Sequence, residues 1–135
     1  MWRDEYKLGH DGIDEQHREI FQRTDEVRRV LHDASPEALI GLITSTADYV
    51  EEHFRYEEDL MKRIGYPDRE RHASIHDTFR AEIKERLRVL HSGGGLNRKR
   101  KEKFLQEMVG WLTFHLQVED RRVVAFDQDS SRKRA

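Results

Sequence analysis

Apolar residues recur at spacings of three and four along four separate stretches of this chain, as in the series Ile75, Phe79, Ile83, Leu87 and Leu90. This period places them on one side of an α-helix, where they form a stripe that a neighbouring helix can cover. Such stripes are necessary, because only 36% of the residues are hydrophobic while 39% are charged. Four amphipathic helices with short connections predict an all-α fold, an antiparallel up-down-up-down four-helix bundle.

Cap and turn residues indicate where these helices begin and end. The first helix is predicted to begin near Asp14 and to end before Ser35-Pro36, where serine caps the second helix and proline takes its first position. Gly65-Tyr66-Pro67 ends the second helix, because glycine frees the backbone and proline cannot continue the hydrogen-bond ladder. The third helix is predicted to end at His91-Ser92, before a turn at Gly93-Gly94-Gly95.

The fourth predicted helix has a basic start and a polar end. The run from Arg98 to Lys101 opposes the helix dipole, so the helix is predicted to begin late or to fray there. A solvated helix start explains this run more simply than a partner or an anionic surface does. Beyond Phe126 the chain turns polar, which predicts a bundle over residues 1–126 and a frayed tail over residues 127–135.

Composition excludes several classes of protein. Lys plus Arg number 25 and Asp plus Glu number 27, so the net charge of −2 argues against a nucleic-acid binder with a uniformly basic surface. Cysteine is absent, which excludes disulfides and thiolate metal sites. The start lacks the apolar stretch of a signal peptide, and the longest apolar run, Ala38 to Ile43, is too short to span a bilayer. These features predict a cytoplasmic protein without nucleic-acid or membrane partners, and they leave a protein partner or self-association open.

Polar residues interrupt the apolar stripes at unusual places. Each predicted helix turns at least one histidine toward the core, and the five are His17, His53, His72, His76 and His115. Glu57 shares the inward face of the second helix, where an isolated buried carboxylate would be very costly unless a cation accompanied it. The pairs His53/Glu57 and His72/His76 are four residues apart, so each pair can reach one metal ion. Imidazole with carboxylate suits iron, zinc, manganese or copper better than magnesium or calcium.

Asp120 follows His115 by five residues, a spacing that a regular α-helix does not serve well. At 3.6 residues per turn the two side chains would point about 140° apart. A π-type bulge between them would improve their alignment, and such bulges often occur at functional sites. We therefore predict a π-bulge here, and a regular ladder from His115 to Asp120 would contradict it.

Each of these residues also has a structural explanation that needs no metal. A single histidine on an apolar stripe is more often a core residue with a hydrogen-bond partner than a ligand. Phe54, Phe79 and Trp111 are explained first as core residues. His10 is assigned to the surface or to packing, and His32 and His91 to helix C-termini, where positive charge is favourable. The metal-site hypothesis depends on the coincidence of five histidines and a glutamate on the inward faces of four helices.

Four short motifs in order carry a resemblance to a known family. They are Gly12-Ile13-Asp14-Glu15-Gln16-His17, His53-Phe54-Arg55-Tyr56-Glu57-Glu58, His72-Ala73-Ser74-Ile75-His76, and Trp111-Leu112-Thr113-Phe114-His115 followed by Asp120. Together they resemble the first-helix segment, the HFxxEE motif, the HxxxH motif and the WLxxH…D motif of the hemerythrin family. The resemblance extends from about Trp2 to Val124.

The resemblance implies a non-haem di-iron site that binds dioxygen. It implies that His72, His76 and His115 hold one iron and that His17 and His53 hold the other. Glu57 and Asp120 would bridge the two irons together with an oxide or hydroxide, and the second iron would keep an open position for dioxygen. The family's pocket-type positions match five further residues of this sequence: Phe54, Phe79, Trp111, Leu112 and Leu116.

The function expected from this resemblance is reversible dioxygen binding for transport, storage or delivery, without enzymatic turnover. Five neutral imidazoles and two carboxylates stabilise highly oxidised iron less than the four carboxylates of ferritin-like di-iron sites do. Two alternatives stay open: an oxygen or redox sensor that signals to a separate partner, and a di-iron enzyme acting on peroxide, nitric oxide or iron. A bundle that has lost its metal is disfavoured, because all seven ligand types are present.

Overall fold

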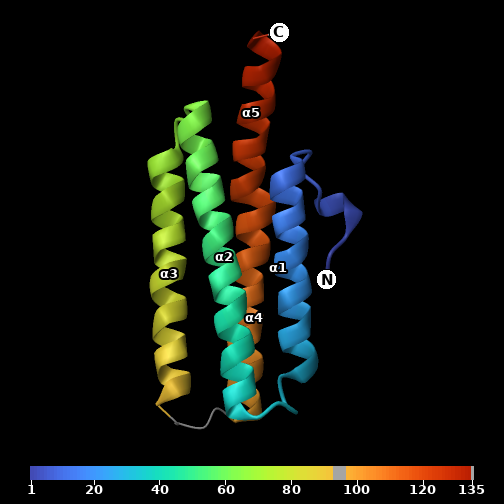
Figure 1. Ribbon diagram of the computed structural model, residues 1–135, viewed down its shortest axis with the longest axis vertical. Coiled ribbons are helices and arrows are strands. Elements are labelled where there is room, and N and C mark those ends of the chain that lie inside the picture. Colours follow the sequence, from blue (N-terminus) through green and yellow to red (C-terminus); the bar gives the residue numbers. More distant parts are fainter. Residues whose placement is uncertain (93–96, 135) are drawn as a thin grey trace.

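The computed structural model describes residues 1–92 and 97–134, and the regular elements in this part of the chain are all helical (Figure 1). The predicted glycine turn at residues 93–95 lies outside the described residues. The last three elements follow one another without a break and form one long rod. The elements are η1 (Asp4–Tyr6), α1 (Asp11–Val30), α2 (Pro36–Ile64), α3 (Arg69–His91), α4 (Arg98–Phe114), η2 (His115–Glu119) and α5 (Asp120–Arg134).

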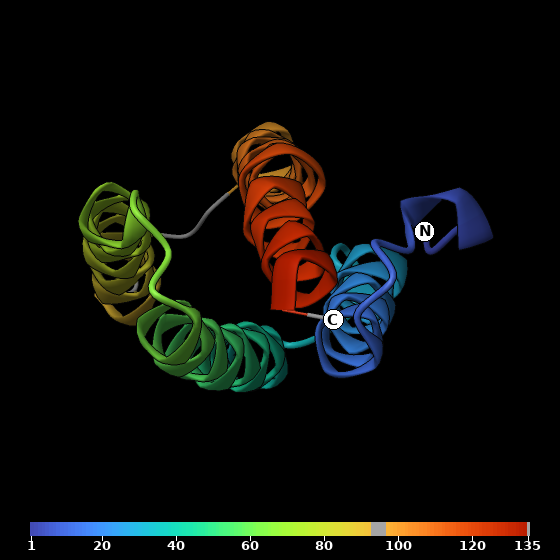
Figure 2. The same cartoon turned by 90° about the horizontal axis from the view of Figure 1, so that it is seen from above.

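The helices pack lengthwise around a common interior. Seen from above, α2 lies between α1 and α3, and the rod of α4 and α5 lies across the interior from α2 (Figure 2). Inward faces from all these helices therefore meet in one space. Within residues 1–92 and 97–134, none of the helices combines the length and the apolar character that a membrane span requires.

The boundaries of α2 agree with the sequence prediction. The Ser35 hydroxyl accepts a hydrogen bond from the Ala38 N–H at 3.2 Å, and Pro36 is the first helical residue. Gly65 ends the helix in the left-handed conformation, with φ at +68°. Glycine is favoured at this position because a Cβ atom destabilises left-handed backbone. The predicted end of α3 at His91 is also confirmed.

The prediction that the first helix begins near Asp14 is wrong, because α1 begins at Asp11. His10 is the cap: its Nδ1 atom accepts a hydrogen bond from the Ile13 N–H at 3.1 Å. The Asp14 carboxylate instead accepts hydrogen bonds from the N–H groups of Leu8 and Gly9, at 2.7 and 3.1 Å. Asp14 therefore fixes the segment that leads into the helix.

The expected late start of the fourth helix is also wrong, because α4 begins at Arg98. Asn97 caps it, accepting a hydrogen bond from the Arg100 N–H at 2.9 Å. The side chain of Arg98 is 76% exposed and lies 3.7 Å from the carboxylate of Glu102. Solvent and this ion pair reduce the conflict between the basic run and the helix dipole.

The polar residues 127–134 are not a frayed tail, because they continue α5 as helix. They project beyond the ends of the neighbouring helices (Figure 1). The backbone hydrogen bonds of the preceding turns extend into this segment, so it needs no apolar stripe of its own to stay helical. The Gln128 side chain donates a hydrogen bond of 3.5 Å to the Gly9 carbonyl oxygen, which ties the base of this projection to the N-terminal segment.

Two apolar clusters divide the core along the bundle axis. The larger contains Ile20, Phe21, Val27, Leu39, Ile43, Val50, Phe54, Phe79, Met108, Leu112 and Leu116, among others. The smaller contains Ile13, Leu60, Met61, Tyr66, Val123 and Val124. Along α1, His17 falls between Ile13 of one cluster and Ile20 of the other, and along α2, Glu57 falls between Phe54 and Leu60. A buried polar layer thus separates the two clusters.

The turn that joins α2 to α3 gives a test of the fold. Gly65→Ala should lower the free energy of unfolding by about 1–2 kcal/mol, because alanine is strained at a positive φ. Gly41→Ala is the matched control: it lies inside α2, where an added Cβ meets no atom within 4 Å, and it should raise stability by about 0.5–1 kcal/mol. Urea unfolding of the metal-free protein measures both. Changes of the same sign would contradict this account of Gly65.

Candidate metal centre

Seven ionisable side chains meet in the polar layer between the two apolar clusters. Each is at most 1% exposed, and they come from α1, α2, α3 and the rod that contains η2 and α5. They are all the residues for which a metal role was predicted: His17, His53, Glu57, His72, His76, His115 and Asp120. The structure therefore brings the complete predicted set together, with none left outside.

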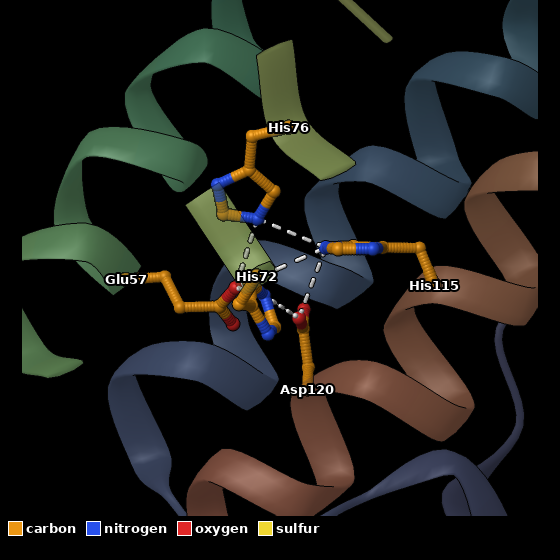
Figure 3. Close-up of side chains that lie close together, drawn as sticks. All are labelled: Glu57, His72, His76, His115 and Asp120. Carbon is orange, nitrogen blue, oxygen red and sulfur yellow. Dashed lines mark hydrogen bonds and ion pairs between the residues drawn. The ribbon is translucent and has the colours of Figure 1, made fainter. Parts of the chain in front are cut away.

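The seven side chains form two adjoining groups that share one residue. The first group contains Glu57, His72, His76, His115 and Asp120, and one ligand atom from each lies within 4.8 Å of the others (Figure 3). The second group contains His17, His53 and Asp120 and satisfies the same limit. Because Asp120 belongs to both groups, two ions bound in them would be neighbours.

Asp120 directs one carboxylate oxygen at each group. Its Oδ1 atom lies 3.2 Å from Nε2 of both His72 and His115. Its Oδ2 atom lies 2.8 Å from His17 Nε2 and 3.0 Å from His53 Nε2. This division is the geometry that a carboxylate bridging two cations requires.

Glu57 divides its oxygens in the same way. Its Oε1 atom lies 2.5 Å from His72 Nε2 and 3.1 Å from His76 Nε2, both in the first group. Its Oε2 atom accepts no hydrogen bond and lies 3.8 Å from His53 Nε2, on the side of the second group. Two carboxylates from different helices therefore connect the two groups.

A π-helical segment gives Asp120 this direction. The five residues His115–Glu119 form one π-turn, and the Asp120 N–H donates its hydrogen bond to the His115 carbonyl oxygen. The π-bulge predicted from the five-residue spacing is confirmed. The wider turn brings residues five apart to the same face, which an α-helix does for residues three and four apart.

Two hydrogen bonds orient the histidine rings from outside the groups. The His53 Nδ1–H donates to Gln16 Oε1 at 2.7 Å, and the His76 Nδ1–H donates to Glu58 Oε2 at 2.6 Å. Arg80 in turn donates to the same Glu58 oxygen at 3.0 Å. With a proton held at Nδ1, each ring directs the lone pair of Nε2 inward, as a metal-ligating histidine does.

Gln16 and Glu58 were not predicted as functional residues. Both lie next to a predicted ligand in sequence, since Gln16 precedes His17 and Glu58 follows Glu57. That adjacency is the signal available in the sequence. Their hydrogen-bond partners lie on other helices, so only the packing of α1 on α2 and of α2 on α3 reveals them.

The donor atoms fit bound cations better than they fit one another. His76 Nε2 and His115 Nε2 lie only 3.0 Å apart, although each neutral ring would offer a lone pair to a metal at this nitrogen. Glu57 Oε2 and Asp120 Oδ1 are buried without a hydrogen-bond donor. Buried acceptors of this kind are costly unless they are paired. A transition metal that takes imidazole nitrogen and carboxylate oxygen would satisfy them together.

The cluster strongly shifts the pKa values of its own members. Burial and the Asp120 charge oppose ionisation of Glu57, yet hydrogen bonds from the three histidines of the first group lower its pKa to about 2. Burial likewise opposes the charge on Asp120, but His115 and its other histidine neighbours hold its pKa well below the usual range. The two carboxylates outweigh burial for His72 and His115 and raise the pKa of each to about 9. For His17 burial prevails and lowers the pKa.

Aromatic rings cover the first group. Phe54 stacks on His76 with ring centroids 3.9 Å apart, and Trp111 stacks on His115 at 4.9 Å and an interplanar angle of 8°. Phe79 stacks on Trp111 in turn, at 4.4 Å. Leu112 and Leu116, the other predicted pocket residues, are buried in the same apolar cluster. Phe54 and Trp111 thus place aromatic rings directly against two of the metal-ligand candidates.

The three remaining histidines lie outside both groups, as expected. His10 caps α1. His32 Nε2 lies 3.0 Å from a carboxylate oxygen of Glu102, and the His91 Nδ1–H donates to the Leu87 carbonyl oxygen at 2.8 Å. Each makes a hydrogen bond or ion-pair contact that needs no metal.

A helical bundle whose core holds two adjoining groups of histidine and carboxylate ligands has the form of a metal-binding protein. A sequence profile described as "Hemerythrin HHE cation binding domain" matches residues 8–126. The chain belongs to the hemerythrin family.

Individual relatives agree with this assignment. The chain is 29% identical over 123 residues to a protein named Bacteriohemerythrin from Stenotrophomonas maltophilia, a match covering 90% of this chain and 76% of the relative. It is 28% identical over 132 residues to a Bacteriohemerythrin from Clostridium acetobutylicum, covering 92% and 98%. A Hemerythrin-like protein from Naegleria gruberi is 31% identical over 78 residues, covering 58% and 60%.

Metal binding by this cluster should release protons. His72 and His115 have pKa values of about 9, above pH 7, so both rings carry their extra proton in the metal-free protein. A ligating histidine must be neutral, so these two rings should release about two protons per chain when ferrous iron binds at pH 7, and a water that becomes a bridging hydroxide would add about one more. Anaerobic titration in weak buffer with a pH indicator measures the release. The His32→Gln variant should release the same number, and release near zero in the unmodified protein would contradict the charge state described here.

Proposed function

We propose that this protein binds dioxygen reversibly at a di-iron centre formed by the seven buried ligands. The observation that carries the proposal is the division of the Asp120 and Glu57 oxygens between two histidine groups. Two carboxylates aimed in this way would hold two cations side by side, which a mononuclear site does not require. The names of the relatives, Bacteriohemerythrin and Hemerythrin-like protein, support the same reading.

The two groups would hold unequal irons. His72, His76 and His115 would ligate the first iron, and His17 and His53 would ligate the second, with both carboxylates and an oxide or hydroxide bridging the pair. The second group offers one histidine fewer than the first. It would therefore leave room for dioxygen at the second iron, and a bound ferrous pair would supply the electrons that dioxygen takes up.

The chain's own residues favour binding over turnover. The apolar clusters on both sides of the polar layer restrict water and protons, which slows irreversible oxidation. Gln16 and Glu58 hold the rings of His53 and His76 in place by hydrogen bonds at Nδ1. Phe54, Phe79, Trp111, Leu112 and Leu116 would form the apolar wall of the dioxygen pocket. A role in transport, storage or delivery, without enzymatic activity, is the function we infer.

Several finer predictions are part of this proposal. The short connections at residues 31–35 and 65–68 support the antiparallel up-down-up-down order of the helices. The near-balanced charge supports a protein without nucleic-acid partners. We further propose that the protein is cytoplasmic and has no membrane partner. If the protein were instead a sensor, a separate partner protein would have to bind the oxygenated and deoxygenated forms differently. Binding of a partner that depends on dioxygen would reveal this role.

Iron loading followed by one oxygen cycle tests the proposal. The protein is loaded anaerobically with ferrous iron, exposed to dioxygen, and then purged. We expect two irons per chain and a visible charge-transfer band that appears with dioxygen and disappears without it. Two irons with a band that decays irreversibly would contradict reversible binding and favour redox sensing or catalysis. Absence of stoichiometric iron loading would contradict the di-iron assignment itself.

A pair of variants assigns the two groups. His53→Leu should retain one iron per chain and lose the reversible band, because it removes half of the histidine ligands of the second group and leaves the first group intact. His91→Gln is the control, since among the described residues this exposed side chain bonds to its own helix and lies outside both groups, and it should keep two irons and the band. Iron content by atomic emission and absorption spectra measure both. An unchanged band in His53→Leu would contradict the place assigned to dioxygen.

A further inference from the structure

An ion pair joins α3 to the π-turn next to the metal-ligand candidates. Arg71 Nη1–H donates to Glu119 Oε2 at 2.9 Å, and Arg71 Nη2–H donates to Glu119 Oε1 at 3.2 Å. The pair is therefore bidentate, the strongest and most directional form of an arginine-carboxylate contact. The Glu119 side chain is only 7% exposed, whereas that of Arg71 is 53% exposed.

Both members of the pair are sequence neighbours of ligand candidates on different helices. Arg71 directly precedes His72 on α3, and Glu119 directly precedes Asp120 at the end of η2. The contact therefore joins two backbone positions that each carry a ligand of the first group. Glu119 belongs to neither ligand group, and both oxygens of its carboxylate accept hydrogen bonds from Arg71.

The π-turn needs such support because it is intrinsically less stable than α-helix. A π-turn is rare and persists where other contacts compensate for its poorer geometry. If residues 115–119 relaxed to α-helix, a shift of one residue in the turn would rotate Asp120 by about 100°. The two carboxylate oxygens of Asp120 would then no longer face the two ligand groups.

The other cation near Glu119 cannot provide this support. Arg122 Nη1 lies 3.9 Å from Glu119 Oε2, three residues along the same rod. A contact within the rod can stabilise the helix locally, but it does not fix the rod against α3. Of these two cations, Arg71 is the one that lies on the helix that carries His72 and His76.

We propose that Arg71 and Glu119 are positioning residues that hold the π-turn in register and so aim Asp120 between the two groups. This inference rests on the metal centre of the proposed function. It adds two residues that bind no metal themselves and that the sequence analysis did not single out. In the absence of metal, the pair keeps the Asp120 N–H bonded to the His115 carbonyl oxygen.

The first test compares two arginine variants with similar exposure. Arg71→Gln removes the bidentate contact from a side chain that is 53% exposed. Arg63→Gln is the control: its side chain is 59% exposed and pairs with Asp59 within α2, away from η2. In metal-free protein, Arg71→Gln should speed amide hydrogen exchange several-fold over residues 115–120 while exchange elsewhere stays unchanged. Arg63→Gln should leave residues 115–120 as they are.

The same variants should differ in iron binding. Loss of a residue that orients a ligand typically weakens metal binding by about 10- to 100-fold, and we expect a loss of that size for Arg71→Gln. Arg71→Lys keeps the charge without the bidentate geometry and should recover part of the loss. Wild-type exchange and wild-type iron affinity in Arg71→Gln would overturn the proposal.

A double-mutant cycle separates this role from a general loss of stability. Because the two residues act through each other, Glu119→Gln combined with Arg71→Gln should weaken iron binding no further than the more harmful single variant does. Fully additive losses would overturn the proposal. If the unmodified protein fails to load two irons, the proposed function fails, and the hydrogen exchange of the metal-free variants still decides whether the ion pair holds the π-turn.

Discussion

Burial of two carboxylates and five imidazoles in one layer is the constraint on which the rest of the structure depends. Charged groups removed from water are costly unless opposite charges or metal ions accompany them. The apolar clusters lie on both sides of this layer, so the inward-facing nitrogen and oxygen atoms depend on one another or on bound cations for partners. Histidines with raised pKa values supply the positive charge in the metal-free protein, and metal binding would replace those protons.

The two ligand groups differ in their surroundings as well as in their histidine count. His76 in the first group donates to the Glu58 carboxylate, whereas His53 in the second group donates to the neutral Gln16 amide. An anionic partner makes a ligating imidazole a stronger donor than a neutral partner does. The two ligand groups therefore differ in the donor strength of their histidines. Such a difference would suit the proposed centre, in which dioxygen binds at only one of the two irons.

Sequence reasoning succeeded where the signal is local. Ser35-Pro36 and Gly65 were identified correctly because capping and left-handed backbone depend on neighbouring residues. It failed at Asp14, since the imidazole of His10 took the capping role, and at Arg98, since Asn97 capped the basic helix start. Residues 127–134 were predicted to fray but are helical, because a helix can extend from the packed first turns of α5 without an apolar stripe of its own. Arg71 and Glu119 were missed because their contact joins residues 48 positions apart.

The sequence by itself determined which faces of the helices are apolar, which five histidines and which glutamate lie on those faces, and that His115 and Asp120 need a π-turn to align. These properties follow from spacing along one helix, which fixes the direction of each side chain relative to its neighbours. Only the tertiary structure decided which oxygen of Glu57 and Asp120 faces which histidine, and which partners orient the rings of His53 and His76. Those relations depend on distances between helices, and the packing of the two apolar clusters sets these distances.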